Sequence, residues 1–430
     1  MDIAIHTLRA VASAIVDPSN SFILIMIALI FYNKNKKIAI MQKMIMGESL
    51  DSPFELTISQ IVLGIFAGAI ASLMFTFLGL VFDENSNIYL LFMLSLFFMA
   101  FKPRFICFAY SGAVLGLTSL AFKYAAIILH MPKLNIVNID ILTLMTLVGV
   151  LHIIEGILVM IDGSRGAIPV FTNRDNKIIG GFALKRYWAL PIAILILLST
   201  ASTDLLAGQS LMTPQWMPAI RGDIVAKILK NSIIASIALY GVIGYSSITF
   251  TKTKATKTLF SGVLIMSYGL LLTAISQLAV FGAAYQFFIL IFAAGLHEAM
   301  LQLEKHLELT LKPKFMSSDE GIMVLEVAPR SPAFQMGIQS GDLIVQINDK
   351  VIEFEDEIVN IVKGNFKSLT FKIKKPSGEL IDTSYSNMPG NKRLGIVIVP
   401  REVPKDNSII KVDDESFKDV LDKMKDIDKK

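Results

Sequence analysis

The chain has 430 residues, of which 53% are hydrophobic and only 18% are charged, and its mean hydropathy is +0.60. A soluble globular protein carries about a quarter of charged residues, so this composition excludes an ordinary soluble enzyme. The charge is also uneven, because residues 1–310 carry 21 Lys/Arg and 16 Asp/Glu whereas residues 311–430 carry 19 and 20. The sequence therefore predicts a membrane domain followed by a soluble domain.

The formal net charge of +4 does not indicate a nucleic-acid partner. The positive surplus lies in the membrane part, where loop Lys and Arg residues set the orientation, and the soluble part is net negative. Cys107 is the only cysteine and lies in an apolar run. Because there is no second cysteine, the sequence excludes a disulfide and a cysteine-based zinc site. No other motif in it indicates a metal or a cofactor.

Nine segments are long and apolar enough to cross a bilayer as helices. An amphipathic or partly inserted helix over residues 3–16 comes before them. Asp17-Pro18 interrupts the first segment and the third is short, so eight spans are the alternative to nine. The segments lie near residues 15–32, 58–81, 87–101, 104–122, 139–161, 187–206, 231–250, 259–279 and 281–299.

Lys and Arg residues in the short loops alternate between the two sides of this topology. Loops around residues 34–43, 102–104, 165–186 and 252–257 hold fourteen of them, against six in the opposite loops. Positively charged loops stay in the cytoplasm. We therefore expect a protein of the cell membrane, in contact with the lipid bilayer, with its amino terminus outside and everything after residue 300 in the cytoplasm.

Small-residue pairs occur in the second and fourth predicted spans, at Gly64-x-x-x-Gly68 and Gly112-x-x-x-Gly116. Glycines at this spacing let backbones approach closely. We expect packing within the chain, and an interface in a homo-oligomer is the alternative.

The longest predicted cytoplasmic loop, residues 162–186, carries two extended runs, AIPVFT and IIGGFAL, around the turn-rich tetrapeptide NRDN. This pattern predicts a β-hairpin at the membrane surface. A solvated basic loop is the alternative.

Ionisable residues inside an apolar span are costly, and each is a functional candidate. His152 and Glu155 lie three residues apart on one face of the fifth predicted span, and Asp162 follows where that helix ends. His297 and Glu298 lie near the end of the ninth. Imidazole and carboxylate groups are zinc ligands, but a hydrogen bond between His152 and Glu155, or to a neighbouring helix, is the simpler interpretation. An ion or proton pathway is the third.

An intramembrane metalloprotease requires more than these residues. Its H-E-x-x-H motif places two His residues one helical turn apart with Glu as the general base, but the sequence from His297 is HEAML. The other half of such a site needs an N-x-x-P-x-x-x-L-D-G context, of which IDG at residues 161–163 supplies only the last two residues. The sequence therefore predicts no catalytic residue and no metal site.

The most specific motif lies in the charged part, where SPAFQMGIQSGDLI begins at Ser331. We expect Ser331 to cap a short helix, Gly337 to end it in the left-handed conformation, and Gly341 to turn the chain into a strand. This stretch resembles a PDZ domain of the bacterial type, over residues 313–402, with Met336 in place of the usual Ala. The signature residues are Ser331, Pro332, Ala333, Gly337, Gly341 and Asp342.

The PDZ resemblance implies a groove helix over Glu353–Lys363, strands over Lys367–Lys374 and Leu380–Ser384, and capture of an extended peptide, often a free carboxyl terminus. Related bacterial domains begin with the carboxylate-binding loop, but its best match here is RLGI from residue 393. This implies a circular shift, and the alternative is that LGIVIV only closes the sheet and the groove is occluded. The predicted groove residues are Leu394, Gly395, Ile396, Ile358, Ile361 and Val362.

The predicted organisation is a polytopic α-helical membrane domain of eight or nine spans over residues 1–310, a small cytoplasmic α+β PDZ domain over 313–402, and a charged tail over 403–430. Apolar residues at spacings of three or four predict a short amphipathic helix in the tail. We expect this tail to be solvated, and its docking on the PDZ domain or on a partner is the alternative.

This architecture, without a protease motif, resembles the MinJ-type cell-division topological determinants of Gram-positive bacteria. The segments LHIIEGILVMIDG and RYWALP are also similar to that family. The resemblance implies a non-enzymatic adaptor at poles and septa that links a curvature-sensing coiled-coil protein to the Min division inhibitor. We predict a membrane scaffold whose PDZ groove binds cytoplasmic or membrane proteins. The alternatives are a degenerate or unrecognised intramembrane metalloprotease with the PDZ domain as substrate filter, and a transporter or sensor with a PDZ regulatory module.

Overall fold

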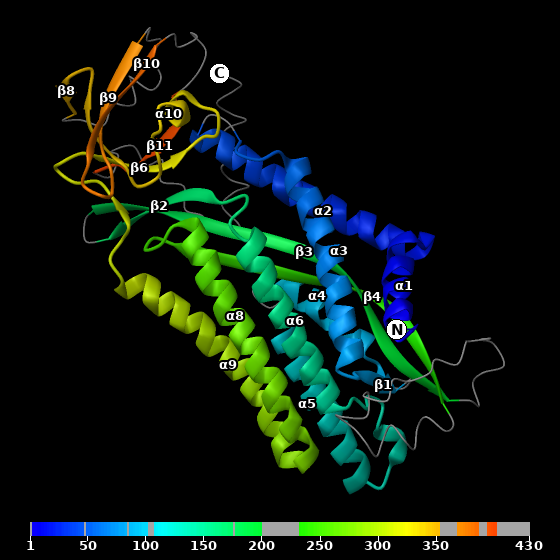
Figure 1. Cartoon of the computed structure of the whole chain (residues 1–430). Helices are drawn as coiled ribbons and strands as arrows, with labels where there is room; N and C mark the ends of the chain where they lie inside the picture. The colour runs from blue at the N-terminus through cyan, green and yellow to red at the C-terminus, as the bar shows by residue number, and fades with distance from the viewer. Residues whose placement is uncertain are drawn as a thin grey trace, which may run out of the picture.

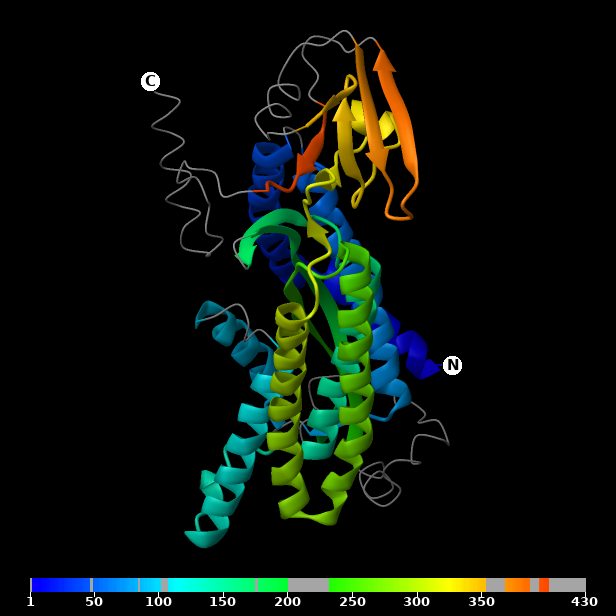
Figure 2. The ribbon, with the colours of Figure 1, turned by 90° about the vertical axis from the view of Figure 1, so that its left-hand side faces the viewer.

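The computed structural model describes residues 2–46, 49–83, 86–101, 107–174, 177–199, 232–352, 368–386 and 394–401. Apolar helices gather around a long antiparallel hairpin, and a small β-rich domain lies at one end of the molecule (Figure 1). Figure 2 shows the same arrangement from the side, with the β-rich domain above the helices. The predicted tail at 403–430 lies outside the described residues.

Helices form most of the amino-terminal domain. Five of them are long and apolar enough to cross a membrane, namely α3, α5, α6, α8 together with the 3-10 turn η6 (Gln277–Phe281), and α9. The pair α1 and α2, bent by 67° at Asp17-Pro18, would give a sixth span. The helices are α1 Asp2–Val16, α2 Pro18–Met46, α3 Pro53–Phe77, α4 Tyr89–Phe101, α5 Phe108–Ile128, α6 Ile141–Asp162, α8 Lys254–Ser276 and α9 Ala283–Thr310.

Side-chain caps explain where several helices begin. The Ser52 hydroxyl accepts a hydrogen bond from the Glu55 backbone N–H at 3.1 Å, and the Glu55 carboxylate accepts one from the Ser52 N–H at 3.1 Å, so α3 starts with a capping box. Asp140 and Thr253 cap α6 and α8 through their side-chain oxygens. These bonds satisfy amide groups that have no partner within the helix.

Two of the nine predicted helical spans, 187–206 and 231–250, are strands among the described residues. β3 (Lys177–Ser199) and β4 (Ser232–Thr249) pair antiparallel in one unbroken register, from Phe182 opposite Thr249 to Ser199 opposite Ser232. The helical prediction is wrong here because a continuous apolar run has no period that separates a buried strand from a buried helix. Isoleucine, which is frequent in β4, favours the strand.

The hairpin predicted within residues 162–186 is confirmed. β2 (Ile168–Arg174) pairs antiparallel with the start of β3, with Arg174 opposite Lys177. β1 (Val81–Asp83) lies parallel to the far end of β3, and β5 (Phe315–Met316) pairs with residues 179–180. β3 is therefore the central strand of a five-stranded sheet.

Helix α3 covers the middle of the β3 edge opposite β4, between the stretches that pair with β2 and with β1. A Cβ atom added at Gly64 would lie 2.1 Å from the Ala189 carbonyl oxygen, and one at Gly68 would lie 2.3 Å from the Pro191 carbonyl oxygen. The expected packing of Gly64-x-x-x-Gly68 within the chain is confirmed, although its partner is a strand. Backbone outside a helix is tolerated at membrane depth only where protein buries it, and α3 provides this cover.

The register of β3 also explains how the strand tolerates Pro191. The Ser72 hydroxyl of α3 accepts a hydrogen bond from the Ala193 backbone N–H at 2.9 Å. Alternate residues of a strand direct their backbone groups to the same side. The backbone nitrogen of Pro191, two residues before Ala193, therefore points toward α3 and away from β4. Its missing N–H removes no bond from the β3–β4 ladder.

Glycines also bring the other helices close together. A Cβ at Gly112 of α5 would meet α6 at 2.9 Å, and one at Gly116 would meet Leu290 of α9 at 2.3 Å. Gly156 of α6 and Gly262 of α8 face each other. A Cβ added at Gly156 would lie 2.5 Å from the Gly262 carbonyl oxygen, and one added at Gly262 would lie 2.6 Å from the Gly156 carbonyl oxygen. The predicted pair Gly112-x-x-x-Gly116 thus also packs within the chain.

The carboxyl-terminal domain has an α+β fold with its own core. Its strand order is β10-β9-β7-β6-β11, with β8 beside β7. The predicted strands at 367–374 and 380–384 are present as β9 and β10. The elements are β6 Ile322–Val327, α10 Pro332–Gln335, β7 Leu343–Ile347, β8 Lys350–Val351, β9 Ser368–Lys374, β10 Leu380–Ser386 and β11 Ile396–Ile398.

This domain packs directly on the helical domain. Leu325 of β6 and Val399 are fully buried in the main hydrophobic cluster, which continues into the helical domain. Phe315 of β5 packs edge-to-face on Phe182 of β3, with ring centroids 5.6 Å apart. The two domains therefore share one apolar interface.

Candidate functional site

The signature residues of the carboxyl-terminal domain build its turns. The Ser331 hydroxyl accepts a hydrogen bond from the Phe334 backbone N–H at 3.2 Å and so caps α10, with Pro332 in the first turn. Gly337 has a φ of +75°, the left-handed conformation that glycine tolerates, and Ile338 then enters the domain core with 1% of its surface exposed. The local structure predicted for this stretch is confirmed.

Asp342 fixes the turn that leads into β7. It is buried, and its Oδ2 atom accepts hydrogen bonds from the Gln339 backbone N–H and the Lys375 ammonium group, each at 2.8 Å. Gly341 before it has a φ of +97°. The predicted signature residues thus shape the scaffold of the domain and place β7 beside β6.

The predicted carboxylate-binding segment leads into β11, an edge strand of the described sheet. The Gly395 and Leu394 carbonyl groups accept hydrogen bonds from the backbone N–H groups of Ala328 and Ala333, at 2.8 and 3.1 Å. The Leu394 side chain is fully buried in the domain core. Among described strands, β11 pairs only with β6, and the carboxyl end of α2 lies beside it (Figure 2).

Gly395 has a structural requirement of its own. Its φ is +75°, and an added Cβ would lie 2.3 Å from the Ser331 Cβ atom. A bulky residue at this position would disturb the cap of α10, so it cannot serve as a clean test of the groove. The remaining predicted groove residues, Ile358, Ile361 and Val362, lie outside the described residues.

Glu308 holds the end of α9, which leads to the carboxyl-terminal domain, against the turn between β4 and α8. Its Oε2 atom accepts hydrogen bonds from the backbone N–H groups of Phe250 and Thr251, at 3.0 and 3.2 Å. Its Oε1 atom lies 3.5 Å from the buried Lys257 ammonium group and 3.7 Å from that of Lys252. Burial raises the pKa of Glu308, but these donors and positive charges outweigh burial and lower the pKa below its ordinary value.

We expect Glu308→Ala to lower the free energy of unfolding by about 1–3 kcal/mol, because buried donors lose their acceptor. A lowered pKa gives stability that is complete above the ordinary pKa of glutamate, near 4.5, and is lost as the pH falls through the native value. Thermal unfolding between pH 7 and pH 3 would measure both effects. Glu320→Gln is the control, because its pair with Lys374 is exposed. Equal pH profiles for the Glu308 variant and the parent chain would contradict this role.

Asp162, one of the three intramembrane candidates, binds Arg186 and Trp188. Its Oδ2 atom accepts hydrogen bonds from Arg186 Nε and Trp188 Nε1, both at 2.9 Å, and also from Arg186 Nη2. The Arg186 Nη2 group donates to the Ser59 hydroxyl at 2.7 Å. All three side chains of the Asp162 group are buried. Asp162 therefore does not converge with His152 and Glu155, and its role is to pair a buried guanidinium group.

Three helices bring Cys107, His152 and His297 together inside the helical domain. The Cys107 Sγ atom lies 3.0 Å from His152 Nε2 and 3.2 Å from His297 Nε2. The sequence excluded a cysteine-based site because no second cysteine is present. The structure places two imidazole groups beside Cys107, from positions 45 and 190 residues away in the sequence, and this contact does not depend on a second cysteine.

Two carboxylates adjoin this Cys107–His152–His297 cluster. The Glu155 Oε2 atom lies 4.0 Å from His152 Nε2, too far for a direct hydrogen bond. The Glu298 carboxylate accepts hydrogen bonds from the Tyr110 hydroxyl at 2.9 Å and from Gln302. Of the two predicted partners of His152, Glu155 does not form a hydrogen bond with it. The partner that His152 has is Cys107, at the start of the neighbouring helix α5.

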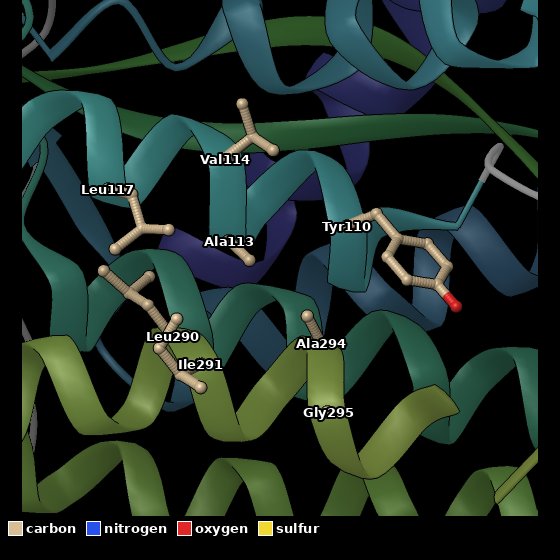
Figure 3. A pocket seen from close by; sticks show the side chains of 8 residues that line it. All are labelled: Tyr110, Ala113, Val114, Leu117, Leu290, Ile291, Ala294 and Gly295. Carbon is tan, nitrogen blue, oxygen red and sulfur yellow. The ribbon is translucent and has the colours of Figure 1, made fainter. Parts of the chain in front are cut away.

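An apolar groove between α5 and α9 ends near this cluster. Figure 3 shows its side chains, with Tyr110 at one end of the row. The same Tyr110 ring packs edge-to-face on His297, with centroids 5.2 Å apart. The lining residues are Tyr110, Ala113, Val114, Leu117, Leu290, Ile291, Ala294 and Gly295.

Comparison with known proteins identifies the carboxyl-terminal domain. Residues 323–374 match the PDZ domain family. Serine protease HTRA3 of Rattus norvegicus is 35% identical over 80 residues, which is 19% of this chain and 17% of the rat protein. Serine protease HTRA3 of Mus musculus is 35% identical over 69 residues, 16% of this chain and 15% of the mouse protein. The chain thus matches less than a fifth of the length of these relatives, at the level of the PDZ domain. The chain carries a PDZ domain, a protein-interaction module, behind a domain of long apolar helices.

Proposed function

We propose that this protein is a membrane-embedded scaffold whose PDZ domain captures protein partners at the cytoplasmic face. The observation that carries the proposal is the PDZ domain at 323–374, fixed on one end of an apolar helical domain. The Lys254 ammonium group lies 2.5 Å from the Glu326 carboxylate of β6, which adds a polar tie to the apolar interface. A fixed domain presents its binding surface at a constant place relative to the bilayer.

The distribution of positive charge supports the cytoplasmic orientation. Three basic segments, residues 34–43, 165–186 and 252–257, belong to the elements nearest the PDZ domain (Figure 1). Gln42 of α2 donates to the Ala167 carbonyl at 3.0 Å, which ties the first two segments together. By the positive-inside rule, this end of the molecule lies in the cytoplasm.

The proposed binding mode is addition of an extended peptide beside the sheet, with the groove helix on its other side. The edge strand β11 offers backbone groups for such pairing. The partners are cytoplasmic or membrane proteins. Resemblance to the MinJ-type determinants supports a role in placing the cell-division machinery at poles and septa, without an enzymatic activity of its own.

Peptide binding by the full-length chain tests this function. We expect peptides with a free carboxyl terminus to bind, and Ile361→Arg, in the predicted groove helix, to weaken binding at least about tenfold through an unpaired charge in an apolar pocket. Val351→Arg is the matched control, because Val351 is 60% exposed on β8. Fluorescence polarisation would measure the affinity of each variant for peptides with a free carboxyl terminus and for the same peptides with an amidated terminus. Equal affinity of the two variants for every bound peptide would overturn the groove assignment.

A further inference from the structure

The Cys107–His152–His297 cluster has the composition of a metal site. A thiol and two imidazoles, from the start of α5 and from within α6 and α9, place one ligand atom each within 4.8 Å of the others. His152 and His297 are 1% and 6% exposed. Polar groups of this kind are rare in apolar helices and mark functional positions.

Both imidazole rings point the same nitrogen at the thiol. Each Nε2 atom faces Cys107 Sγ, and each Nδ1 atom faces an oxygen, the Val148 carbonyl at 2.7 Å for His152 and the Tyr110 hydroxyl at 3.4 Å for His297. A proton on His152 Nδ1 leaves Nε2 with a free lone pair. Metal-binding histidines use this arrangement, because a bond at one ring nitrogen fixes the tautomer and orients the other.

The distances fit a small metal ion after a slight expansion. Zinc–sulfur and zinc–nitrogen bonds of about 2.3 and 2.05 Å at a tetrahedral angle place the two ligand atoms about 3.6 Å apart. The separations from Cys107 Sγ to the two Nε2 atoms are 3.0 and 3.2 Å. Cys107 caps its helix from a position just outside the first turn, so a shift of roughly half an ångström would not require α6 or α9 to move.

We propose that Cys107, His152 and His297 bind one Zn²⁺ ion, with the nearby Glu155 carboxylate as the fourth ligand. Zn²⁺ accepts sulfur, nitrogen and oxygen ligands in a tetrahedral set. Binding forms the zinc–sulfur and zinc–oxygen bonds and releases the protons of the Cys107 thiol and the Glu155 carboxyl to solvent. The thiolate and the Glu155 carboxylate then neutralise the two positive charges of the ion, and a neutral site suits an apolar interior. The site is separate from the PDZ domain, so its test does not depend on the function proposed above.

The test uses the full-length protein in detergent, stripped with a chelator and titrated with Zn²⁺ against a competing chromophoric chelator. We expect one ion per chain, and we expect Cys107→Ser and His297→Gln each to lower the affinity more than about 100-fold, since even outer partners of metal ligands contribute 10–100-fold. His306→Gln on the same helix is the control, because His306 is exposed. Unchanged affinity in both ligand variants would overturn the proposal.

Two further measurements separate metal binding from folding. Zn²⁺ should raise the Tm of the parent chain by mass action, and Co²⁺ in its place should give a thiolate-to-metal absorption band that Cys107→Ser abolishes. Tyr110→Phe should weaken binding about tenfold with the stoichiometry unchanged, because it removes only an outer partner of His297. Failure of the folded parent chain to bind Zn²⁺ would show that the cluster is a hydrogen-bonded thiol–imidazole group without a metal.

Discussion

Replacing Asp162 with Ala should lower the free energy of unfolding by about 3–5 kcal/mol, the usual effect of removing one partner of a buried ion pair. Arg186 has no exposed surface, and Asp162 Oδ2 accepts from both its Nε and its Nη2 groups. Without Asp162, the guanidinium charge would stay buried with neutral acceptors only, such as the Ser59 hydroxyl. Trp188 would lose its acceptor as well. Chemical unfolding in detergent, followed by tryptophan fluorescence, would measure the loss.

A second Asp–Arg pair at the same end of the molecule provides the control. Arg165 and Asp51 approach within 3.6 Å, but their side chains are 44% and 23% exposed. Asp51→Ala should change stability by no more than about 1 kcal/mol. In addition, Asp162→Leu combined with Arg186→Met should recover part of the stability lost in Asp162→Ala, because no buried charge remains unpaired. Equal effects of Asp162→Ala and Asp51→Ala would show that burial of the first pair does not matter.

The PDZ domain was predictable because its structure follows from neighbouring residues. Ser331 caps the helix that starts at the next residue, and Gly337 and Gly341 take the positive φ values that favour glycine. Each signal acts within a few residues of the motif that carries it. Gly395 is different, because its close contact with Ser331 joins positions far apart in the sequence, and no local pattern reveals such a contact.

The helical domain was predictable in part, since length and hydropathy find an apolar segment but not its conformation. Seven of the nine predicted spans coincide with helices, and the other two are β3 and β4. Pro191, the fifth residue of one such run, is a local signal against an ordinary helix, because proline has no backbone N–H to donate. The Cys107–His152–His297 cluster was not predictable for another reason. Its members come from three helices, and only their packing brings the ligand atoms together.

The contact between α3 and β3 leads to the second prediction of large effect. We expect Gly64→Ala to destabilise the protein by about 1–3 kcal/mol, because the new Cβ would lie 2.1 Å from the Ala189 carbonyl oxygen and force the strand away from the helix. This loss would exceed the gain of up to about 1 kcal/mol that alanine normally brings to a helix interior. Thermal unfolding in detergent, together with the yield of folded protein, would measure the net change.

Gly295 of α9 gives the matched control, because among the described residues no atom outside its chain neighbours and its own helix backbone lies within 4 Å of the position of an added Cβ. Gly295→Ala should therefore be neutral or stabilising through helix propensity alone. Opposite signs for the two substitutions would show that α3 is held against the strand backbone. The stretch of β3 between its pairings with β1 and β2 depends on that cover, since a buried backbone carbonyl group needs a partner and apolar helices supply none. If Gly64→Ala were as well tolerated as Gly295→Ala, α3 would not be needed at this distance, and the hairpin would have to be covered in another way.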